Sequence, residues 1–254
     1  MLFPNRAIGF LMMLALASGL LPCCAAEQPS ANSSNELNGG CVTGTVISPQ
    51  SSPKARVADD SGLFRDLLEI DRATRGVRYV LAFLEPNKQT PAQHPRSILS
   101  GNKLPSLKID QQESTFVPHL IGARDGQPVR FTNSDPANHN VRATSFEAGN
   151  EFNIYVANGS EYTHTFQADE RQRPVMLGCD IHPWMRGWIY VFDHPWFAVT
   201  DVAGRFVITN VPPGEYRLQL RQPDIGYVGT RTISIRSNET HRVEIEIDLR
   251  KSFR

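Results

Sequence analysis

The chain has 254 residues, carries 26 Lys and Arg against 26 Asp and Glu, and is 40% hydrophobic. This composition is typical of a globular protein with a buried core, and the length allows one or two domains. The balanced charge excludes the basic surplus that nucleic-acid-binding proteins carry, so no nucleic-acid partner is expected.

Residues 1–26 differ in composition from the rest of the chain. Arg6 is followed by the apolar run AIGFLMMLALASGLLP and then by CCAA. This order is typical of a secretory signal peptide, with cleavage after Ala26, and predicts a secreted or periplasmic protein. A lipoprotein anchored at Cys23 is the alternative, although Pro22 fits that signal poorly. No later apolar run is long enough to span a bilayer.

The signal peptide contains one charged residue, Arg6, so the mature chain would carry 25 basic against 26 acidic residues, a net charge of −1. Residues 27–40 are small and polar, which indicates a flexible linker. Residues 41–47 form a short strand candidate. One short helix is predicted over residues 61–73, because its leucines, Phe64 and Ile70 share a face.

A strand is expected over residues 77–85 and a long loop over 86–105. From residue 106 onward, turn residues separate short β-prone stretches. The turns include DVAG and VPPGEY, and the last three stretches alternate as half-buried antiparallel strands do. The pattern predicts an all-β fold of β-sandwiches with a boundary near residue 194. The expected strands are 106–110, 116–123, 127–133, 139–144, 162–167, 174–179, 187–193, 196–201, 204–209, 215–221, 231–236 and 241–248.

The stretch GCDIHPWMRGW holds Cys179, His182 and Met185 at a C-x2-H-x2-M spacing, and His139 lies upstream in SDPANHNV. Two imidazoles, a thiolate and a thioether suit a soft, redox-active metal, and this donor set is that of blue-copper sites. Zinc rarely uses methionine, and the C-x-x-C-H motif of haem attachment is absent. One copper ion per chain is therefore predicted.

A disulfide competes with this interpretation. After loss of the signal peptide only Cys41 and Cys179 remain, and two cysteines in an exported protein often pair. The other histidines, His119 among them, lack ligand-like spacing. Cys179 and His182 could also form a nucleophile–base pair, although no orienting partner is evident.

Residues 114–193 resemble the cupredoxins, most closely their amicyanin and plastocyanin branch. The resemblance rests on DGQPVRFTNSDPANHNV and GCDIHPWMRGWIYV. It implies a Greek-key β-sandwich with a type 1 copper held by four residues: His139, Cys179, His182 and Met185. It also implies that Asn140 holds the ligand loop by hydrogen bonds.

The stretch FAVTDVAGRFVITNVPPGEYRLQL resembles the carboxypeptidase regulatory-like module, a transthyretin-like β-sandwich without catalytic residues. The expected organisation is therefore a cupredoxin-like domain over 41–193, which includes the short helix, followed by this second sandwich over 194–254. Because VTGTVI resembles the first strand of the second module, an alternative is that the cupredoxin is inserted within it.

An exported electron-transfer protein is the function that these features favour. Copper oxidases and nitrite reductases need further histidine clusters, and the chain has no His-x-His pair, so no enzyme activity is expected. Redox partner proteins are expected to dock near His182 and Trp184. The alternatives are a non-redox binding module on the same scaffold and a copper storage or delivery protein.

Overall fold

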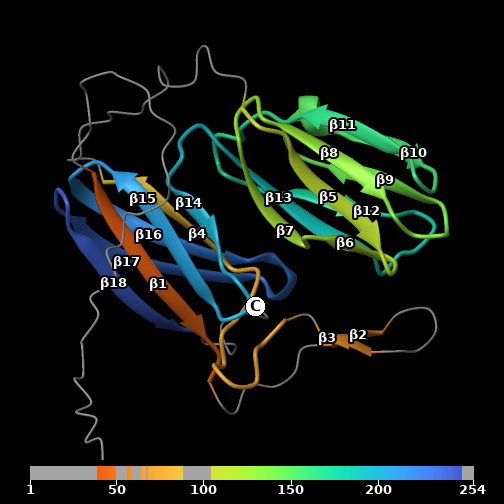
Figure 1. The fold of residues 1–254 in the computed structure, drawn as a ribbon. Coiled ribbons are helices and arrows are strands. Elements are labelled where there is room, and N and C mark those ends of the chain that lie inside the picture. Colours follow the sequence, from red (N-terminus) through yellow and green to blue (C-terminus); the bar gives the residue numbers. More distant parts are fainter. Residues whose placement is uncertain (1–38, 50–55, 59–63, 67, 88–103, 248–254) are drawn as a thin grey trace, which may run out of the picture. The chain divides into compact units, whose positions relative to one another are not determined.

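The computed structural model describes residues 39–49, 56–58, 64–66, 68–87 and 104–247 (Figure 1). The predicted all-β fold is confirmed: these residues form strands and two short 3₁₀ helices, η2 (Ala148–Asn150) and η3 (Pro223–Ile225), with no α-helix among them. None of their helices is long and apolar enough to cross a membrane. The predicted signal peptide, most of the predicted linker and residues 88–103 of the predicted loop lie outside the described residues.

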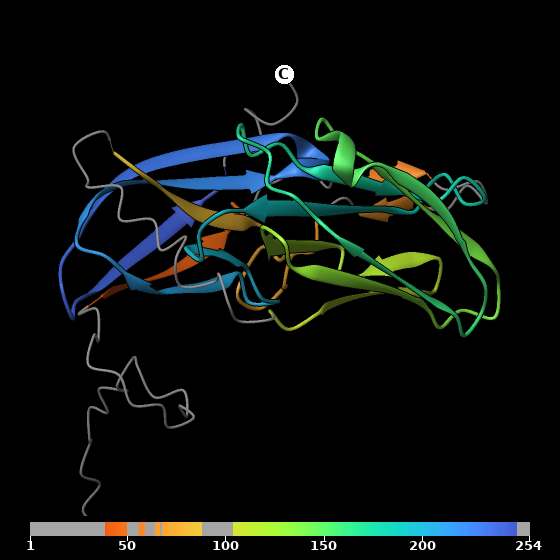
Figure 2. The same ribbon diagram turned by 90° about the horizontal axis from the view of Figure 1, so that it is seen from above.

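A first sandwich is built from strands in the middle of the chain, drawn in yellow-green to teal in Figures 1 and 2. Their bounds are Leu107–Gln112 (β5), Thr115–Val117 (β6), Leu120–Arg124 (β7), Pro128–Asn133 (β8), His139–Thr144 (β9), Phe152–Val156 (β10), Glu161–Thr165 (β11), Val175–Gly178 (β12) and Arg186–Phe192 (β13). One sheet has the order β10-β9-β12-β13-β7 and the other β11-β8-β5-β6. Side chains from both sheets, such as Phe131 and Leu177, share one buried core.

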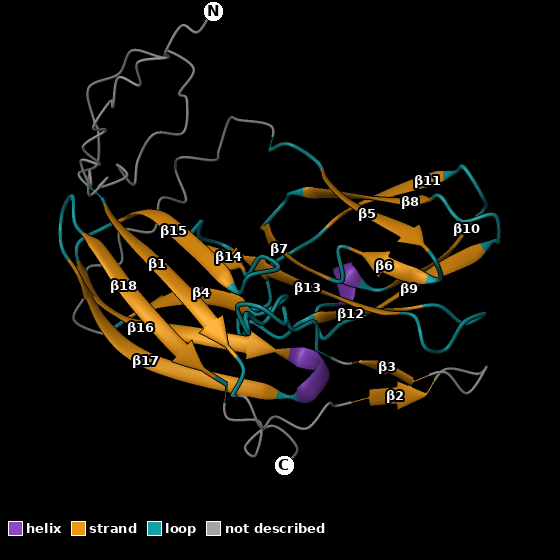
Figure 3. Cartoon of the chain, turned by 60° about the horizontal axis from the view of Figure 1, so that its bottom comes forward, coloured by secondary structure: helices purple, strands orange, loops and turns teal. Residues whose placement is uncertain are grey.

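A second sandwich combines strands from both ends of the described chain. Its bounds are Gly40–Ile47 (β1), Leu81–Pro86 (β4), Phe197–Val199 (β14), Arg205–Val211 (β15), Gly214–Gln222 (β16), Tyr227–Ile235 (β17) and Thr240–Glu246 (β18). The sheets have the orders β15-β1-β18 and β14-β4-β16-β17, and η3 connects β16 to β17 (Figure 3). A further pair, β2 (Arg56–Ala58) and β3 (Phe64–Asp66), stands as a two-stranded ribbon.

Apart from Gly40, strands β1 and β4 lie within residues 41–193, the range expected for the cupredoxin-like domain, but they do not pair with the strands of the first sandwich. Gly44 of β1 pairs with Phe206 on one side and Val243 on the other, and β4 pairs with β14 and β16. Both strands therefore belong with the C-terminal strands, as the insertion alternative requires. A strand's own residues show its periodicity but not its distant partner, which is why the boundary did not emerge from the pattern.

The predicted helix over 61–73 is wrong in its described part. Phe64–Asp66 form β3, and a tight turn follows. The Asp71 carboxylate accepts hydrogen bonds from the backbone N–H and the hydroxyl of Thr74 at 2.7 and 2.9 Å, while the Asp71 N–H donates to the Gly76 carbonyl. A short acidic side chain that satisfies nearby backbone groups favours a turn over a helix.

The expected strands from residue 106 onward are present, with two differences. The stretch 116–123 is divided at Pro118 into β6 and β7, because proline has no N–H for the strand ladder. Strand β10 was not predicted, and it lies at the edge of its sheet beside β9. That position matters for the site, because β10 supplies Asn153.

A third buried cluster contains side chains of both sandwiches. Tyr79, Leu81 and Phe83 pack there with residues of β7 and β13, which are Leu120, Tyr190 and Phe192. A Cβ atom added at Gly122 of β7 would lie 2.5 Å from the Phe197 ring, so glycine allows the close approach of β14.

Candidate metal centre

The strand register of the first sandwich brings the ligand candidates to one end of a sheet. Strand β12 pairs with β9 so that Gly178 lies opposite Arg142. Continuing this antiparallel register carries Cys179, just after β12, toward His139 at the start of β9. His182 lies in the loop between β12 and β13, so its ring can approach from the same end.

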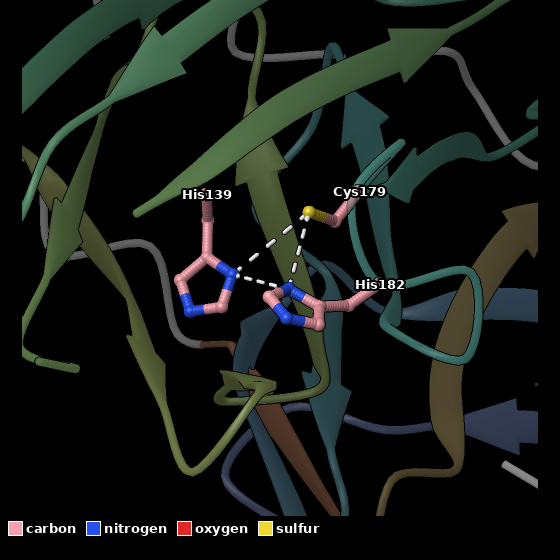
Figure 4. Close-up of side chains that lie close together, drawn as sticks. All are labelled: His139, Cys179 and His182. Atoms are coloured by element: carbon pink, nitrogen blue, oxygen red, sulfur yellow. Dashed lines mark hydrogen bonds between the residues drawn. The ribbon is translucent and has the colours of Figure 1, made fainter. Parts of the chain in front are cut away.

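Figure 4 shows the side chains of His139, Cys179 and His182 pointing toward one another. The two Nδ1 atoms of the histidines are 2.9 Å apart, and the Cys179 Sγ lies 3.9 Å from each of them. His139 and Cys179 are buried, and His182 is partly buried. The three donor atoms thus form a compact triangle that is largely shielded from water.

This triangle has the size of a metal site. A point in the plane of the three atoms lies about 2.1 Å from each of them, close to the ~2.0–2.1 Å and ~2.3 Å of zinc–nitrogen and zinc–sulfur bonds in proteins. One thiolate and two imidazoles in a plane are also the equatorial donors of blue-copper sites. The residues therefore fit the predicted metal in donor type and in spacing.

Asp135 orients the ring of His139. Its carboxylate lies 2.8 Å from the Nε2 of His139, so that nitrogen carries the proton and Nδ1 presents its lone pair to the triangle. The carboxylate also accepts hydrogen bonds from the N–H groups of Glu113 and Ser114 at 2.6 and 2.9 Å. Burial raises the pKa of Asp135, but the hydrogen bonds from Ser114, His139 and Glu113 lower it more, so the net shift is downward.

Asn140 holds the start of the ligand loop, as the resemblance implied. Its side-chain oxygen accepts hydrogen bonds from the Asp180 N–H at 2.7 Å and from the Cys179 thiol at 3.3 Å. These contacts tie the loop after β12 to β9. The position of Cys179 is therefore fixed by the strand on its N-terminal side and by Asn140 on the other.

Met185 is buried in the same core cluster as Cys179, and its N–H donates to the His182 carbonyl at 2.9 Å. This bond closes the tight turn between the two residues. The fourth candidate ligand thus lies inside the sandwich at the base of the loop, and its role as a ligand stays a prediction.

Trp184 packs partly inward, although redox partner proteins are expected to dock near it. It is partly buried against the core, and its ring meets the His182 ring edge-on with centroids 5.1 Å apart. The indole Nε1 is buried and has no hydrogen-bond partner among the described residues. Ile181, by contrast, is 50% exposed at the tip of the loop.

No disulfide joins the two described cysteines. Cys41 and Cys179 are both buried thiols, and Cys41 lies in β1 of the second sandwich. His119 also lies apart from the triangle, because its Nε2 pairs with the Asp224 carboxylate at 2.8 Å. The structure thus favours the metal interpretation of Cys179 over the disulfide.

The sequence analysis did not predict two acidic residues of this centre. Asp135 stands four residues before His139 in SDPANH, and Asp180 directly follows Cys179. Proximity to a ligand candidate was the signal that could have found them, since residues that orient metal ligands are commonly carboxylates.

No protein-family model and no curated protein sequence matches this chain. Solved structures do match. These structural neighbours include cupredoxins. A reduced mutant of amicyanin is 20% identical over 34% of this chain and 81% of its own, with a TM-score of 0.31. A purple cupredoxin from Nitrosopumilus maritimus is 22% identical over 34% of this chain and 98% of its own, with a TM-score of 0.28.

A copper-containing nitrite reductase (NirK) from Thermus scotoductus SA-01 is 20% identical, with a TM-score of 0.32. The match covers 39% of this chain and 26% of the reductase. Likeness at this level is no guide to activity, so the case for a function rests on the residues of the site.

Proposed function

We propose that this chain is an exported, copper-binding electron-transfer protein that holds one copper ion per chain. The observation that carries the proposal is the buried triangle of His139 Nδ1, Cys179 Sγ and His182 Nδ1. These three residues would hold the copper, and the thioether of the buried Met185 would be a fourth, weaker ligand. The donor set and its spacing support this assignment.

Bound copper would supply a one-electron couple between Cu(II) and Cu(I). The protein would contribute ligands whose positions change little between the Cu(II) and Cu(I) states. Asp135 fixes the ring of His139, and Asn140 and the turn closed by Met185 fix the loop. Ligands held by such contacts rearrange little, which favours rapid electron exchange.

We propose that electrons enter and leave through the edge of His182. This ring is the least buried of the three donors, and the exposed Ile181 lies beside it in the loop. Trp184 supports the ring from the side. A redox partner protein would dock here through a small apolar contact, as transient electron-transfer partners do.

We further propose that the chain performs no substrate chemistry, since it has no His-x-His pair for a second copper centre. Copper storage or delivery is a weaker alternative, because buried donors with fixed orientations exchange metal slowly. A non-redox binding module is the other alternative. The carboxypeptidase regulatory-like identity of the second sandwich stays a proposal that rests on the sequence resemblance.

The export proposal rests on residues 1–26. Mass spectrometry of the protein from its native source tests it. A mature chain that begins at Glu27 supports a secreted or periplasmic protein, and a lipidated Cys23 supports the anchored alternative.

Voltammetry of the copper-loaded protein tests the electron-transfer role. One copper per chain with a reversible one-electron wave is expected, and Cys179→Ser should abolish the wave because serine offers no thiolate. Tight copper binding without a reversible wave would favour storage. A folded wild-type protein that binds no copper would favour the binding module and overturn the proposal.

A further inference from the structure

The carboxylate of Asp180 lies at the centre of a polar network beside the metal site. One of its oxygens accepts hydrogen bonds from the side-chain amides of Asn140 and Asn153 at 2.9 and 2.8 Å. The other pairs with the guanidinium of Arg142 at 2.6 Å. Asp180 directly follows Cys179, so this network ties the cysteine's neighbour to two strands, β9 and β10.

The network uses every hydrogen-bonding position of the Asn140 side chain. Its NH₂ group donates to Asn153 at 2.8 Å and to the Asp180 carboxylate at 2.9 Å. Its oxygen accepts from the backbone N–H of Asp180 at 2.7 Å and from the Cys179 thiol at 3.3 Å. An amide group has two donor hydrogens and two acceptor lone pairs, and all four are occupied here.

These partners allow one orientation of the amide. If the Asn140 amide were flipped, its oxygen would face the Asp180 carboxylate and its NH₂ group would face the Asp180 N–H. Acceptor would then oppose acceptor, and donor would oppose donor. Leaving a buried hydrogen-bonding group unsatisfied costs about 1–3 kcal/mol, and more for a charged group. The flipped state is therefore strongly disfavoured.

We propose that Asp180 is a positioning residue that turns the carbonyl oxygen of Asn140, and not its N–H, toward the Cys179 sulfur. This inference deepens the proposed function and rests on it for one consequence. A thiolate that faces a carbonyl oxygen receives no hydrogen bond from it and keeps its electron density for the metal. Since hydrogen bonding around the cysteine sulfur tunes such sites, Asp180 lowers the reduction potential of bound copper.

Arg142→Gln is a control variant whose reduction potential should shift in the opposite direction to that of Asp180→Ala. The Arg142 guanidinium pairs with the Asp180 carboxylate and makes no hydrogen bond to the Asn140 amide. Arg142→Gln therefore removes a positive charge near the site while every hydrogen bond of Asn140 stays in place, and the potential should fall. Asp180→Ala removes the negative charge and one of the two acceptors of the Asn140 NH₂ group, which loosens the amide, and the potential should rise.

Ionic strength separates the two effects within Asp180→Ala. Both side chains of the ion pair are partly exposed, 42% for Asp180 and 49% for Arg142, so salt screens their charges. The shift caused by charge should shrink at high salt, as should the whole shift of Arg142→Gln. The shift caused by reorienting the amide should persist.

The test measures the midpoint potentials of copper-loaded wild type, Asp180→Ala and Arg142→Gln at low and high salt. A second arm follows hydrogen exchange of the Asn140 side-chain NH₂ in the metal-free proteins by NMR. We expect a rise for Asp180→Ala that persists at high salt, a fall for Arg142→Gln that does not, and exchange about tenfold faster in Asp180→Ala alone, the effect of losing one charge-assisted hydrogen bond.

A potential for Asp180→Ala that returns to the wild-type value at high salt, or unchanged exchange in that variant, would overturn the positioning role. The metal-free arm does not depend on copper. A protein that binds no copper refutes the proposed function, and the exchange rates then still decide whether Asp180 holds the Asn140 amide. If Asp180→Ala fails to fold, Asp180→Asn in both arms replaces it, with the same expected directions.

Discussion

At the scale of single residues, the carboxylate of Asp135 orients the ring of His139, a predicted metal ligand. It accepts the Nε2 proton of that ring and is itself held by two backbone N–H groups. The ring thus has a fixed tautomer and a fixed direction before any metal arrives. Such partners raise the affinity of the ligand that they orient.

Asp135→Ala should therefore lower copper affinity by about 10–100-fold, the usual effect of losing a partner that orients a ligand. A competition titration against a chelator of known affinity measures it. Asp169→Ala is the matched control, because Asp169 pairs with Arg173 in the loop before β12 and forms no hydrogen bond with a ligand candidate. Equal losses of affinity in the two variants would show that Asp135 acts only through general stability.

Cys41→Ala should leave the copper stoichiometry unchanged. Cys41 is buried in β1 of the second sandwich, and no disulfide links it to Cys179. Non-reducing mass spectrometry of the native protein should accordingly find both cysteines as thiols. A Cys41–Cys179 bond in that experiment would remove the thiolate from the site and contradict the copper assignment.

Most residues of the candidate site could be predicted from the sequence. His139, Cys179 and His182 were predicted from residue type and spacing, and the structure brings their donor atoms together. Asp180 and Asn153 were not predicted, because their role depends on which strands lie next to each other. Asn153 belongs to β10, whose pairing with β9 places it opposite Arg142.

At the scale of elements, the turn between β14 and β15 packs on β1 through a glycine. Gly204 has a φ of +75°, and a Cβ added there would lie 2.2 Å from the carbonyl oxygen of Val46. Gly126, in the turn before β8, has a similar φ of +76° but open space around it. The two glycines therefore share backbone conformation and differ in crowding.

Gly204→Ala should destabilise the protein more than Gly126→Ala. The control carries only the cost of placing alanine in the left-handed region, about 1 kcal/mol, whereas Gly204→Ala must also displace backbone. Urea denaturation of both variants measures the difference. Equal losses in the free energy of unfolding would show that the turn can move away from β1 at no cost.

The elements also show which features of the fold sequence patterns can predict and which they cannot. Strand periodicity located nearly all strands after residue 106, since alternation is a local property. The helix over 61–73 failed because the Asp71 side chain competes for backbone groups within a few residues. The pairing of β1 with β15 and β18 could be suggested only by resemblance, because it joins segments that lie far apart in the chain.

At the scale of the whole molecule, Asp224 links the two sandwiches. This carboxylate follows β16, is almost fully buried, and receives hydrogen bonds from His119 at 2.8 Å and from the Trp188 indole at 2.9 Å. Burial raises the pKa of Asp224, but the hydrogen bonds and charge of its partners lower it by more, so the net shift is downward.

The sign of this shift sets a pH dependence. A carboxyl group whose pKa is lower in the folded state stabilises the protein above its unfolded pKa, and this contribution is lost as the pH falls through the folded pKa. Asp224→Asn should therefore reduce the free energy of unfolding at pH 7 by about 1–3 kcal/mol. Urea denaturation should show the gap to wild type closing below pH 3.8, the ordinary value for aspartate. A gap that stays constant down to pH 2 would show that the charge of Asp224 contributes nothing.

The central claim is that Cys179 binds copper as a thiolate together with His139 and His182. Titration of the metal-free protein with Cu(II), followed by visible absorption, tests it most directly. Thiolate-to-copper charge transfer should produce an intense blue or green colour that saturates at one copper per chain and is absent in Cys179→Ser. A colourless saturated protein, or a Cys179→Ser variant that keeps the visible band, would contradict the claim.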